Sequence, residues 1–269
     1  MVVFPNAKIN LGLHITEKRS DGYHNIESVF YPIPLMDALE IKENGTSLNN
    51  FKSLGLTIPS DGGMNLTERA WELVNNHIPI PNVDLELLKN IPIGAGLGGG
   101  SADAAFCIVA LNSFFNLQIP EDKLLKMAGK LGADCSFFIK NQPIYAAGTG
   151  DQFSELEFSL KGKYIVLVYP NIHVSTPSAY KHVIPSRPKY DIRAVLRLPI
   201  EQWKKKLAND FEVSVFEEYP TIKTIKESLY EQEAIYASMS GSGSSVFGIF
   251  HTEPTVKFDD SVRYWTLKL

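Results

Sequence analysis

The sequence has little that would suit a secreted, membrane-bound or nucleic-acid-binding protein. Its 269 residues include two cysteines, Cys107 and Cys135, which is too few for a disulfide framework. No apolar run reaches membrane-spanning length, and Pro5 interrupts the apolar start too early for a signal peptide. The formal net charge is −4, so no broad basic surface exists for nucleic acid or an anionic membrane. We expect a cytoplasmic protein that binds small molecules and neither nucleic acid nor membrane; the sequence does not specify its oligomeric state.

The usual kinase signatures are missing as well. No glycine-rich loop ends in the Gly-Lys-Ser/Thr of a Walker motif, and the HRD and DFG elements of protein kinases are absent. The histidines, His14 and His77 among them, do not have the spacing of a metal site. Any anionic ligand must therefore be held by a local feature of the backbone and its neighbours.

The composition is that of an ordinary globular protein, with 44% hydrophobic and 21% charged residues. The length suggests two domains, which we place at residues 1–150 and 151–269, with the default site in a cleft between them. Apolar periodicity predicts helices and strands in a mixed α/β (α+β) fold. The predicted helices begin at Leu66, with a capping box from Asn65 and Glu68, near Ser101, at Glu121 and at Glu201; the predicted strands are 83–88, 164–169, 236–239 and 246–250.

The strongest chemical signal is the segment PIGAGLGGGSADAA, residues 92–105, in which five glycines fall within seven residues before an amphipathic helix. Glycine removes the Cβ barrier to unusual backbone angles, so successive N–H groups can turn toward an anion. The helix that follows adds partial positive charge at its N-terminus, with Ser101 predicted as its N-cap. Such a segment can hold a di- or triphosphate without a lysine. A flexible turn is the ordinary alternative, but five clustered glycines cost backbone entropy.

Gly94, Gly96 and Gly99 also satisfy the GxGxxG pattern of dinucleotide-binding folds. That fold requires a fully buried strand before the loop and an acidic residue at the end of a second strand about 20 residues later. Here the preceding strand alternates apolar and polar residues, and Glu121 follows Pro120 at a helix start. The pattern by itself is a weak signal, and its surroundings do not support a dinucleotide site.

Two further segments carry ionisable residues. Lys8 lies in PNAKINL, residues 5–11, and Asp134 lies in GADCSFFI, residues 132–139, where we predict a turn after a helix. Taken singly, Lys8 is typical of an outward strand residue and Asp134 of a helix cap. Together with the glycine segment and with SMSGSGSSVFGIF, residues 238–250, these two segments form an ordered set of four motifs along the chain.

That set resembles the GHMP kinase superfamily, named for galacto-, homoserine, mevalonate and phosphomevalonate kinases. The element DGYH, residues 21–24, within AKINLGLHITEKRSDGYHNIESVFYPI, is similar to the branch that acts on a cytidine diphosphate-linked polyol in isoprenoid precursor biosynthesis. Ser136 stands where that branch commonly has proline, and Ala102 and Asp103 stand where a second serine is frequent. A kinase for another small alcohol, such as mevalonate or homoserine, and a nucleotide-binding sensor without activity are the alternatives.

The resemblance implies a two-domain GHMP kinase fold with ATP and Mg²⁺ bound in the N-terminal domain. It makes Asp134 the general base and Lys8 the cation that holds it. The residues that it places at the ATP site are Pro92, Ile93, Gly94, Ala95, Gly96, Leu97, Gly98, Gly99, Gly100, Ser101, Ala102, Asn65 and Lys89. Those that it places at the cytidine-linked polyol are Asn10, Tyr23, His24, Tyr180, Gly241 and Ser242.

Overall fold

The computed structural model describes residues 1–59 and 62–269, which divide into two compact units. Unit 1 consists of Met1–Ala7, Leu35–Ile93 and Gly98–Gln142. Unit 2 consists of Lys8–Pro34, Gly94–Leu97 and Pro143–Leu269. Each unit is therefore built from segments that are far apart in the sequence. The mixed α/β class is confirmed, while the division at residue 150 and the cleft between domains stay predictions.

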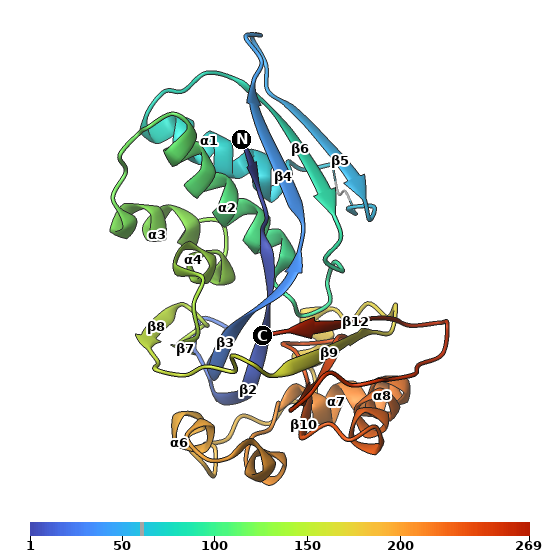
Figure 1. Ribbon diagram of the computed structural model, residues 1–269. Helices are drawn as coiled ribbons and strands as arrows, with labels where there is room; N and C mark the ends of the chain where they lie inside the picture. The colour runs from blue at the N-terminus through green and yellow to red at the C-terminus, as the bar shows by residue number, and fades with distance from the viewer. Residues whose placement is uncertain (60–61) are drawn as a thin grey trace. The chain divides into compact units, whose positions relative to one another are not determined.

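Unit 1 is a four-stranded sheet with its helices on one face (Figure 1). The strand order is β1-β4-β6-β5, with β5 parallel to β6 and the other pairs antiparallel. Its elements are β1 (Val2–Val3), β4 (Ala38–Glu43), β5 (Asn50–Gly55), β6 (Val83–Lys89), α1 (Leu66–His77), α2 (Gly99–Phe114), α3 (Glu121–Gly129) and α4 (Ala133–Lys140).

The sheet of unit 1 is half buried because its strands alternate. In β6, Val83, Leu85 and Leu87 are buried against the helices, whereas Glu86 and Leu88 are exposed. Burying a leucine side chain fully stabilises the fold by roughly 1.5–3 kcal/mol. The predicted strand is confirmed, and its polar face explains why this sheet lacks the continuous apolar strand of a dinucleotide-binding fold.

The predicted helix starts at Leu66 (α1) and Glu121 (α3) are confirmed, and two other predictions for the helices of unit 1 are corrected. The capping box of α1 is present, because Asn65 Oδ1 accepts from the Thr67 N–H and Glu68 Oε2 accepts from the Asn65 N–H. Helix α2 begins earlier than predicted, with Gly98 as N-cap at φ +70°, so Ser101 lies in the first turn and is not the cap. Asp134, predicted on a turn, lies in the first turn of α4, because eight residues were too few to show periodicity.

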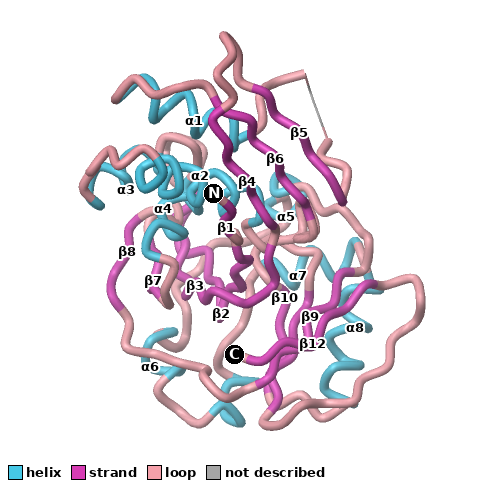
Figure 2. Tube along the Cα trace, turned by 45° about the horizontal axis from the view of Figure 1, so that its top comes forward, coloured by secondary structure: helices cyan, strands magenta, loops and turns pink. Residues whose placement is uncertain are grey.

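Unit 2 contains two four-stranded sheets, in the orders β2-β3-β7-β8 and β10-β11-β9-β12 (Figure 2). Strand β9 lies inside the second sheet and pairs antiparallel with both β11 and β12. Its strands are β2 (Asn6–Lys18), β3 (His24–Met36), β7 (Ile144–Ala147), β8 (Gln152–Glu155), β9 (Tyr164–Tyr169), β10 (Tyr236–Met239), β11 (Val246–Phe250) and β12 (Arg263–Lys268). Its helices are α5 (Thr176–Tyr180), α6 (Ile192–Leu196), α7 (Phe211–Glu218), α8 (Pro220–Glu231) and the 3₁₀ helix η1 (Ile200–Lys205).

Apolar residues of α7 and α8 pack on the second sheet of unit 2. Ile222 and Leu229 of α8 share a buried cluster with Val166 and Val168 of β9. The predicted strands 164–169, 236–239 and 246–250 are confirmed with the same bounds. The helix predicted from Glu201 is a 3₁₀ helix that begins at Ile200. None of the helices formed by residues 1–59 and 62–269 has the length and apolar character needed to cross a bilayer.

Candidate functional site

The glycine segment has the backbone geometry of an anion-binding nest. Gly94, Gly96 and Gly98 alternate along it, with φ angles of +64°, +76° and +70°. Alternation between left-handed and ordinary conformations turns successive N–H groups to one side, and only glycine adopts the left-handed region at little cost. The first intrahelical hydrogen bond of α2 runs from the Ala102 N–H to the Gly98 carbonyl, so the N–H groups before it remain for a ligand.

A cavity of about 820 Å³ opens within unit 1 beside the start of α2. Gly100 of α2 and Ile93 line it together with the N-terminus of α1, including Asn65 and Leu66. Its other wall is the chain from Phe51 through Pro59, which supplies Leu54, Leu56 and Ile58. The volume falls in the range of small-molecule sites. An apolar pocket next to an anion nest suits a ligand with a flat ring and a phosphate chain.

Two of the predicted ATP-site residues have other partners in unit 1. The Asn65 side chain caps α1, as described above. Lys89 is 3% exposed, and its Nζ donates to Asp37 and, over 2.7 Å, to Asp103 Oδ2. The ammonium group of Lys89 thus lies inside unit 1 between two carboxyl groups, although Lys89 is the last residue of β6, the strand that leads to the glycine segment.

Asp134 lies near the glycine segment within unit 1. Helices α2 and α4 pack against each other, and the thiol of Cys135 interacts with the Ser101 hydroxyl in the first turn of α2. Burial raises the pKa of the Cys135 thiol to about 11, so this cysteine is neutral at physiological pH and is a poor nucleophile. Its neighbour Asp134 is half-buried at the N-terminus of α4, where a carboxylate is favoured.

Lys8 belongs to a buried chain of polar groups in unit 2. Its Nζ donates to Asn10 Oδ1 at 2.7 Å and lies 4.9 Å from the centre of the Phe30 ring. The Asn10 amide donates to Ser28 Oγ at 2.8 Å, and the Ser28 hydroxyl donates to the Gly12 carbonyl at 2.6 Å. Asn10 is 1% exposed, so in this structure it orients Lys8 and does not face solvent.

The C-terminal glycine turn packs on the first half of the glycine segment, within unit 2. Ser240 Oγ donates to the Gly96 carbonyl at 2.8 Å and accepts from the Asn10 N–H at 3.3 Å. A Cβ on Gly96 would overlap the Ser240 carbonyl oxygen, and one on Gly241 would lie 3.2 Å from the Gly96 Cα. The buried amide of Asn209 donates to the Met239 and Gly241 carbonyls, both at 2.8 Å.

Sequence reasoning missed Asn209, Ser28 and Ser240. Ser240 lies inside the motif SMSGSGSSVFGIF, but the sequence did not show its hydrogen bond to Gly96, because Gly96 is 144 residues away. Asn209 stands outside every motif and follows a helix, where an asparagine is usually a turn residue. Only its position in the folded chain identifies it as the residue that holds the turn.

Replacing Ser240 by alanine should lower the free energy of unfolding by about 1–3 kcal/mol, because the Gly96 carbonyl and the Asn10 N–H both lose a buried partner. We also expect slower turnover, since both residues adjoin the site. Urea denaturation and steady-state kinetics measure the two effects. Ser159→Ala is the matched control, because Ser159 also accepts from a backbone N–H, that of Lys161, but is exposed. Equal stability of the two variants would contradict the prediction.

The aromatic residues predicted at the substrate also lie in unit 2. The His24 and Tyr180 rings stack directly, with centroids 4.5 Å apart and an interplanar angle of 19°, so no base fits between them without movement of a ring. Burial, followed by the Lys18 charge, lowers the pKa of His24, which favours the neutral imidazole. Tyr23 is 68% exposed. Ser242 Oγ lies 3.4 Å from Thr176 Oγ1, at the start of α5.

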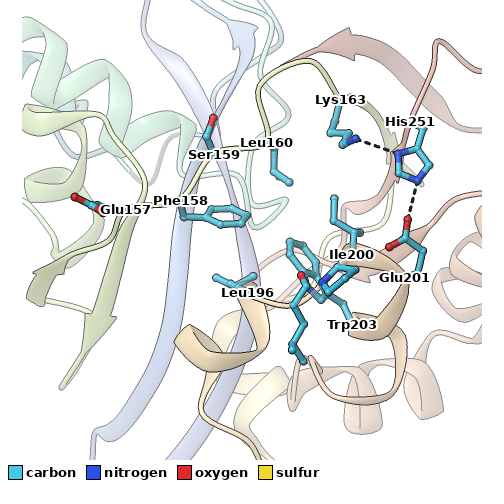
Figure 3. Close-up of a pocket in the computed structure, with 12 residues that line it drawn as sticks. Glu157, Phe158, Ser159, Leu160, Lys163, Leu196, Ile200, Glu201, Trp203 and His251 are labelled. Carbon is cyan, nitrogen blue, oxygen red and sulfur yellow. Dashed lines mark hydrogen bonds and ion pairs between the residues drawn. The ribbon is translucent and has the colours of Figure 1, made fainter.

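A second pocket, of about 430 Å³, lies in unit 2 (Figure 3). Phe158, Leu160, Ile200 and Trp203 give it an apolar lining. At one rim, Lys163 Nζ lies 3.0 Å from His251 Nδ1, and His251 Nε2 lies 2.8 Å from Glu201 Oε1. The imidazole therefore has a partner at both nitrogens. None of the predicted site residues lines this pocket.

Family models match both parts of the chain. The N-terminal domain of GHMP kinases matches residues 65–142, and the C-terminal domain of GHMP kinases matches residues 192–258. The first match contains Asn65, the glycine segment and Asp134, and the second contains the C-terminal glycine turn.

Two similar proteins carry the same name. A 4-diphosphocytidyl-2-C-methyl-D-erythritol kinase of Bacteroides fragilis is 52% identical over 258 residues, which is 95% of this chain and 94% of that protein. One from Parabacteroides distasonis is 50% identical over 255 residues, covering 95% and 93%.

Solved structures with the same fold include a crystal structure of 4-(cytidine 5'-diphospho)-2C-methyl-D-erythritol kinase. It has a TM-score of 0.80 and 31% identity, covering 93% of this chain and 90% of that one. A mevalonate kinase structure has a TM-score of 0.74 at 16% identity, covering 100% and 98%, and this second likeness concerns the fold alone.

Proposed function

Because this chain belongs to the GHMP kinase family, and to its 4-diphosphocytidyl-2-C-methyl-D-erythritol kinases, we propose that it phosphorylates that cytidine-linked polyol. The reaction transfers the terminal phosphoryl group of ATP to the 2-hydroxyl and gives the 2-phosphate and ADP. It belongs to isoprenoid precursor synthesis by the methylerythritol phosphate route. The observation that carries the proposal is about 50% identity, along nearly the whole chain, to kinases with this name.

In this proposal ATP binds at the glycine segment. Its phosphates lie at the nest formed around Gly96 and Gly98 and at the N-terminus of α2, where unpaired N–H groups and the helix dipole favour negative charge. The adenine ring enters the cavity lined by Leu54, Ile58 and Ile93. A lysine is not needed, which agrees with Lys89 being held by two carboxyl groups inside the unit.

Mg²⁺ is the metal that this chemistry implies, and the residues fit a cation carried mainly by the nucleotide. Among residues 1–59 and 62–269, no three acidic, histidine or cysteine side chains gather to form a protein cage, and Mg²⁺ usually keeps water and phosphate oxygens as ligands. In this proposal phosphate oxygens of the nucleotide and water hold the cation, and no side chain among the described residues is assigned to it. When bound, Mg²⁺ neutralises charge on the phosphates.

Asp134 and Lys8 act on the acceptor hydroxyl in this proposal. An Asp134 carboxylate oxygen accepts the proton of the 2-hydroxyl as that oxygen attacks the terminal phosphorus, and the bond to the ADP oxygen breaks. The ammonium group of Lys8 stabilises the negative charge around the reacting oxygens, while Asn10 keeps it in place through the 2.7 Å hydrogen bond. Phosphoryl transfer depends on such positioning and charge neutralisation more than on covalent chemistry.

The cytidine end of the substrate binds to unit 2 at Tyr23, His24 and Tyr180. Neutral His24 presents a donor and an acceptor to the polar edge of the base, and an aromatic ring offers its face for stacking. Since the His24 and Tyr180 rings already stack on each other, the base would stack on the outer face of one ring or displace the other. Gly241 and Ser242 lie in the turn that packs on Gly96, on the substrate side.

ADP formation with a panel of alcohols tests the function. We expect turnover with 4-diphosphocytidyl-2-C-methyl-D-erythritol and no turnover above background with mevalonate or homoserine. A substrate with uridine in place of cytidine should react much more slowly. The polar edge of uracil exchanges a hydrogen-bond donor and acceptor relative to cytosine, so polar groups of the site would lose their partners. Turnover with mevalonate or homoserine alone would overturn the substrate assignment. ATP binding without turnover of any alcohol would instead indicate a nucleotide sensor.

A further inference from the structure

Three ionisable side chains meet in the interior of unit 1, and the reaction described above uses none of their charges directly. Asp37 lies in the link between β3 and β4, Lys89 is the last residue of β6, and Asp103 lies in the second turn of α2. Their exposed fractions are 2%, 3% and 2%. Lys89 Nζ donates to Asp37 Oδ2 and to Asp103 Oδ2, the latter at 2.7 Å.

This Asp37–Lys89–Asp103 triad contacts the chain on both sides of the glycine segment. On the entry side, Asp37 Oδ1 accepts from the Asn90 N–H at 2.5 Å and from the Ile91 N–H at 2.8 Å. On the exit side, a Cβ on Gly99 would lie 2.9 Å from Lys89 Nζ, so the ammonium group packs against the first residue of α2. The triad therefore holds the strand that leads into the segment and the helix that leaves it.

The charges of the triad do not balance when both acids are ionised. Two carboxylates and one ammonium give a formal charge of −1 in a site that excludes water, where an unbalanced charge is costly. Asp103 Oδ1 is buried and has no hydrogen-bond partner among residues 1–59 and 62–269, which suits a protonated carboxyl better than a carboxylate. Burial raises the pKa of Asp103, the Lys89 charge opposes the rise and the Asp37 charge adds to it, with a net pKa of about 7.

Among residues 1–59 and 62–269, the titratable groups that interact with Asp103 are Lys89 from β6, Asp37 from the β3–β4 link and Cys107, one turn later on α2. Burial raises the pKa of the Cys107 thiol well above its ordinary value, so this thiol stays neutral. A change of charge at the N-terminus of α2 therefore acts mainly on the proton of Asp103.

We propose that Asp37, Lys89 and Asp103 are positioning residues for the phosphate-binding amides, and that Asp103 takes up a proton when a nucleotide binds. The phosphates add negative charge at the start of α2, where it disfavours the ionised carboxylate in the next turn of the helix. Protonation makes the triad neutral and removes its repulsion of the phosphates. By linkage, nucleotide binds more tightly as the pH falls through the range in which Asp103 titrates.

This proposal rests on the placement of the nucleotide proposed above, and ADP binding tests both. Calorimetric titration of the full chain with ADP at pH 7.5, in two buffers of different ionisation enthalpy, gives the number of protons taken up. Asp103→Asn preserves shape and mimics the neutral acid, so it should lower proton uptake by roughly half a proton relative to the unmodified chain. ADP titrates near the same pH, but its contribution is common to both proteins and cancels.

Asp84→Asn is the matched control. Asp84 lies on β6 near the opposite end from Lys89, and hydrogen bonds from Asn50 and Asn44 lower its pKa, so it remains ionised at pH 7.5 and its removal should not change proton uptake. Equal uptake by the unmodified chain and Asp103→Asn would overturn the proposal while leaving the nucleotide site intact. Failure of the unmodified chain to bind ADP would overturn the nucleotide site itself.

A measurement on the unmodified chain covers the case in which Asp103→Asn does not fold. With aspartate labelled at the carboxyl carbon with ¹³C, one signal should titrate near pH 7 without ligand and at higher pH with ADP bound. Absence of any aspartate signal titrating between about pH 6 and 8, or a midpoint that ADP leaves in place, would overturn the proposal. A triad with a purely structural role would affect the free energy of unfolding without changing the proton uptake on ADP binding or the titration midpoint of the aspartate signal.

Discussion

Replacing Asp134 by asparagine should lower kcat by about 10²–10⁴-fold, the usual contribution of a positioned general base. The amide keeps the size of the side chain and cannot accept the proton of the substrate hydroxyl. The KM for ATP should stay close to its original value, because the nest and the cavity beside α2 do not include Asp134. Initial rates of ADP formation over a range of both substrates separate the two constants.

Asp122→Asn is a suitable control for this variant. Asp122 lies in the first turn of α3 as Asp134 lies in the first turn of α4, so each substitution removes one favourable interaction with a helix dipole. Loss of activity in both variants would point to helix stability, and loss in Asp134→Asn alone would point to catalysis. Turnover of Asp134→Asn within a few-fold of the original rate would remove Asp134 from the mechanism.

Replacing Lys89 by methionine should destabilise unit 1 by about 3–5 kcal/mol, the range for breaking a buried ion pair at one partner. Methionine fills similar space but leaves Asp37 and Asp103 buried without their cation. Urea denaturation monitored by circular dichroism measures the loss, and poor recovery of soluble protein would be consistent with it. The pH dependence should also change, because the variant gains stability as the pH falls and the two carboxyl groups protonate.

Lys52→Met provides the comparison. Lys52 lies on β5 of the same sheet, its side chain is 61% exposed, and its Nζ is 3.8 Å from Glu86 Oε2. Exposed pairs of this kind contribute about 0–1 kcal/mol, so this variant should remain close to the original stability. If Lys89→Met were equally stable and only the KM for ATP rose, Lys89 would be a ligand of the nucleotide and not part of the interior of unit 1.

The features that sequence reasoning found are those with short-range causes. The capping box of α1 joins Asn65 and Glu68, three residues apart, and the alternation of β6 is a property of seven successive residues. The bounds of β10 and β11 follow from apolar runs on either side of a glycine turn. The glycine segment was recognisable for the same reason, since its backbone angles are set by its own residues.

The wrong predictions occurred where the local sequence pattern was weak or fitted two structures equally well. Ser101 is a good N-cap residue, yet Gly98 can adopt the left-handed conformation at which α2 starts, so the helix begins three residues earlier than predicted. Asp134 was assigned to a turn because α4 is short. The assignment of Lys89 to the ATP site by resemblance stays a prediction, but its two acidic partners were not visible in the sequence, because they lie 52 and 14 residues away.

By itself, the sequence determined the family, the α/β class and the left-handed backbone angles of the glycine segment, because spacing and residue type along a short stretch dictate local backbone geometry. Only the tertiary structure decided which charges meet. It buried Lys89 between two aspartates, joined Ser240 to Gly96 and stacked His24 on Tyr180. Such pairings depend on which distant segments pack together and how far they exclude water, and a linear pattern contains neither.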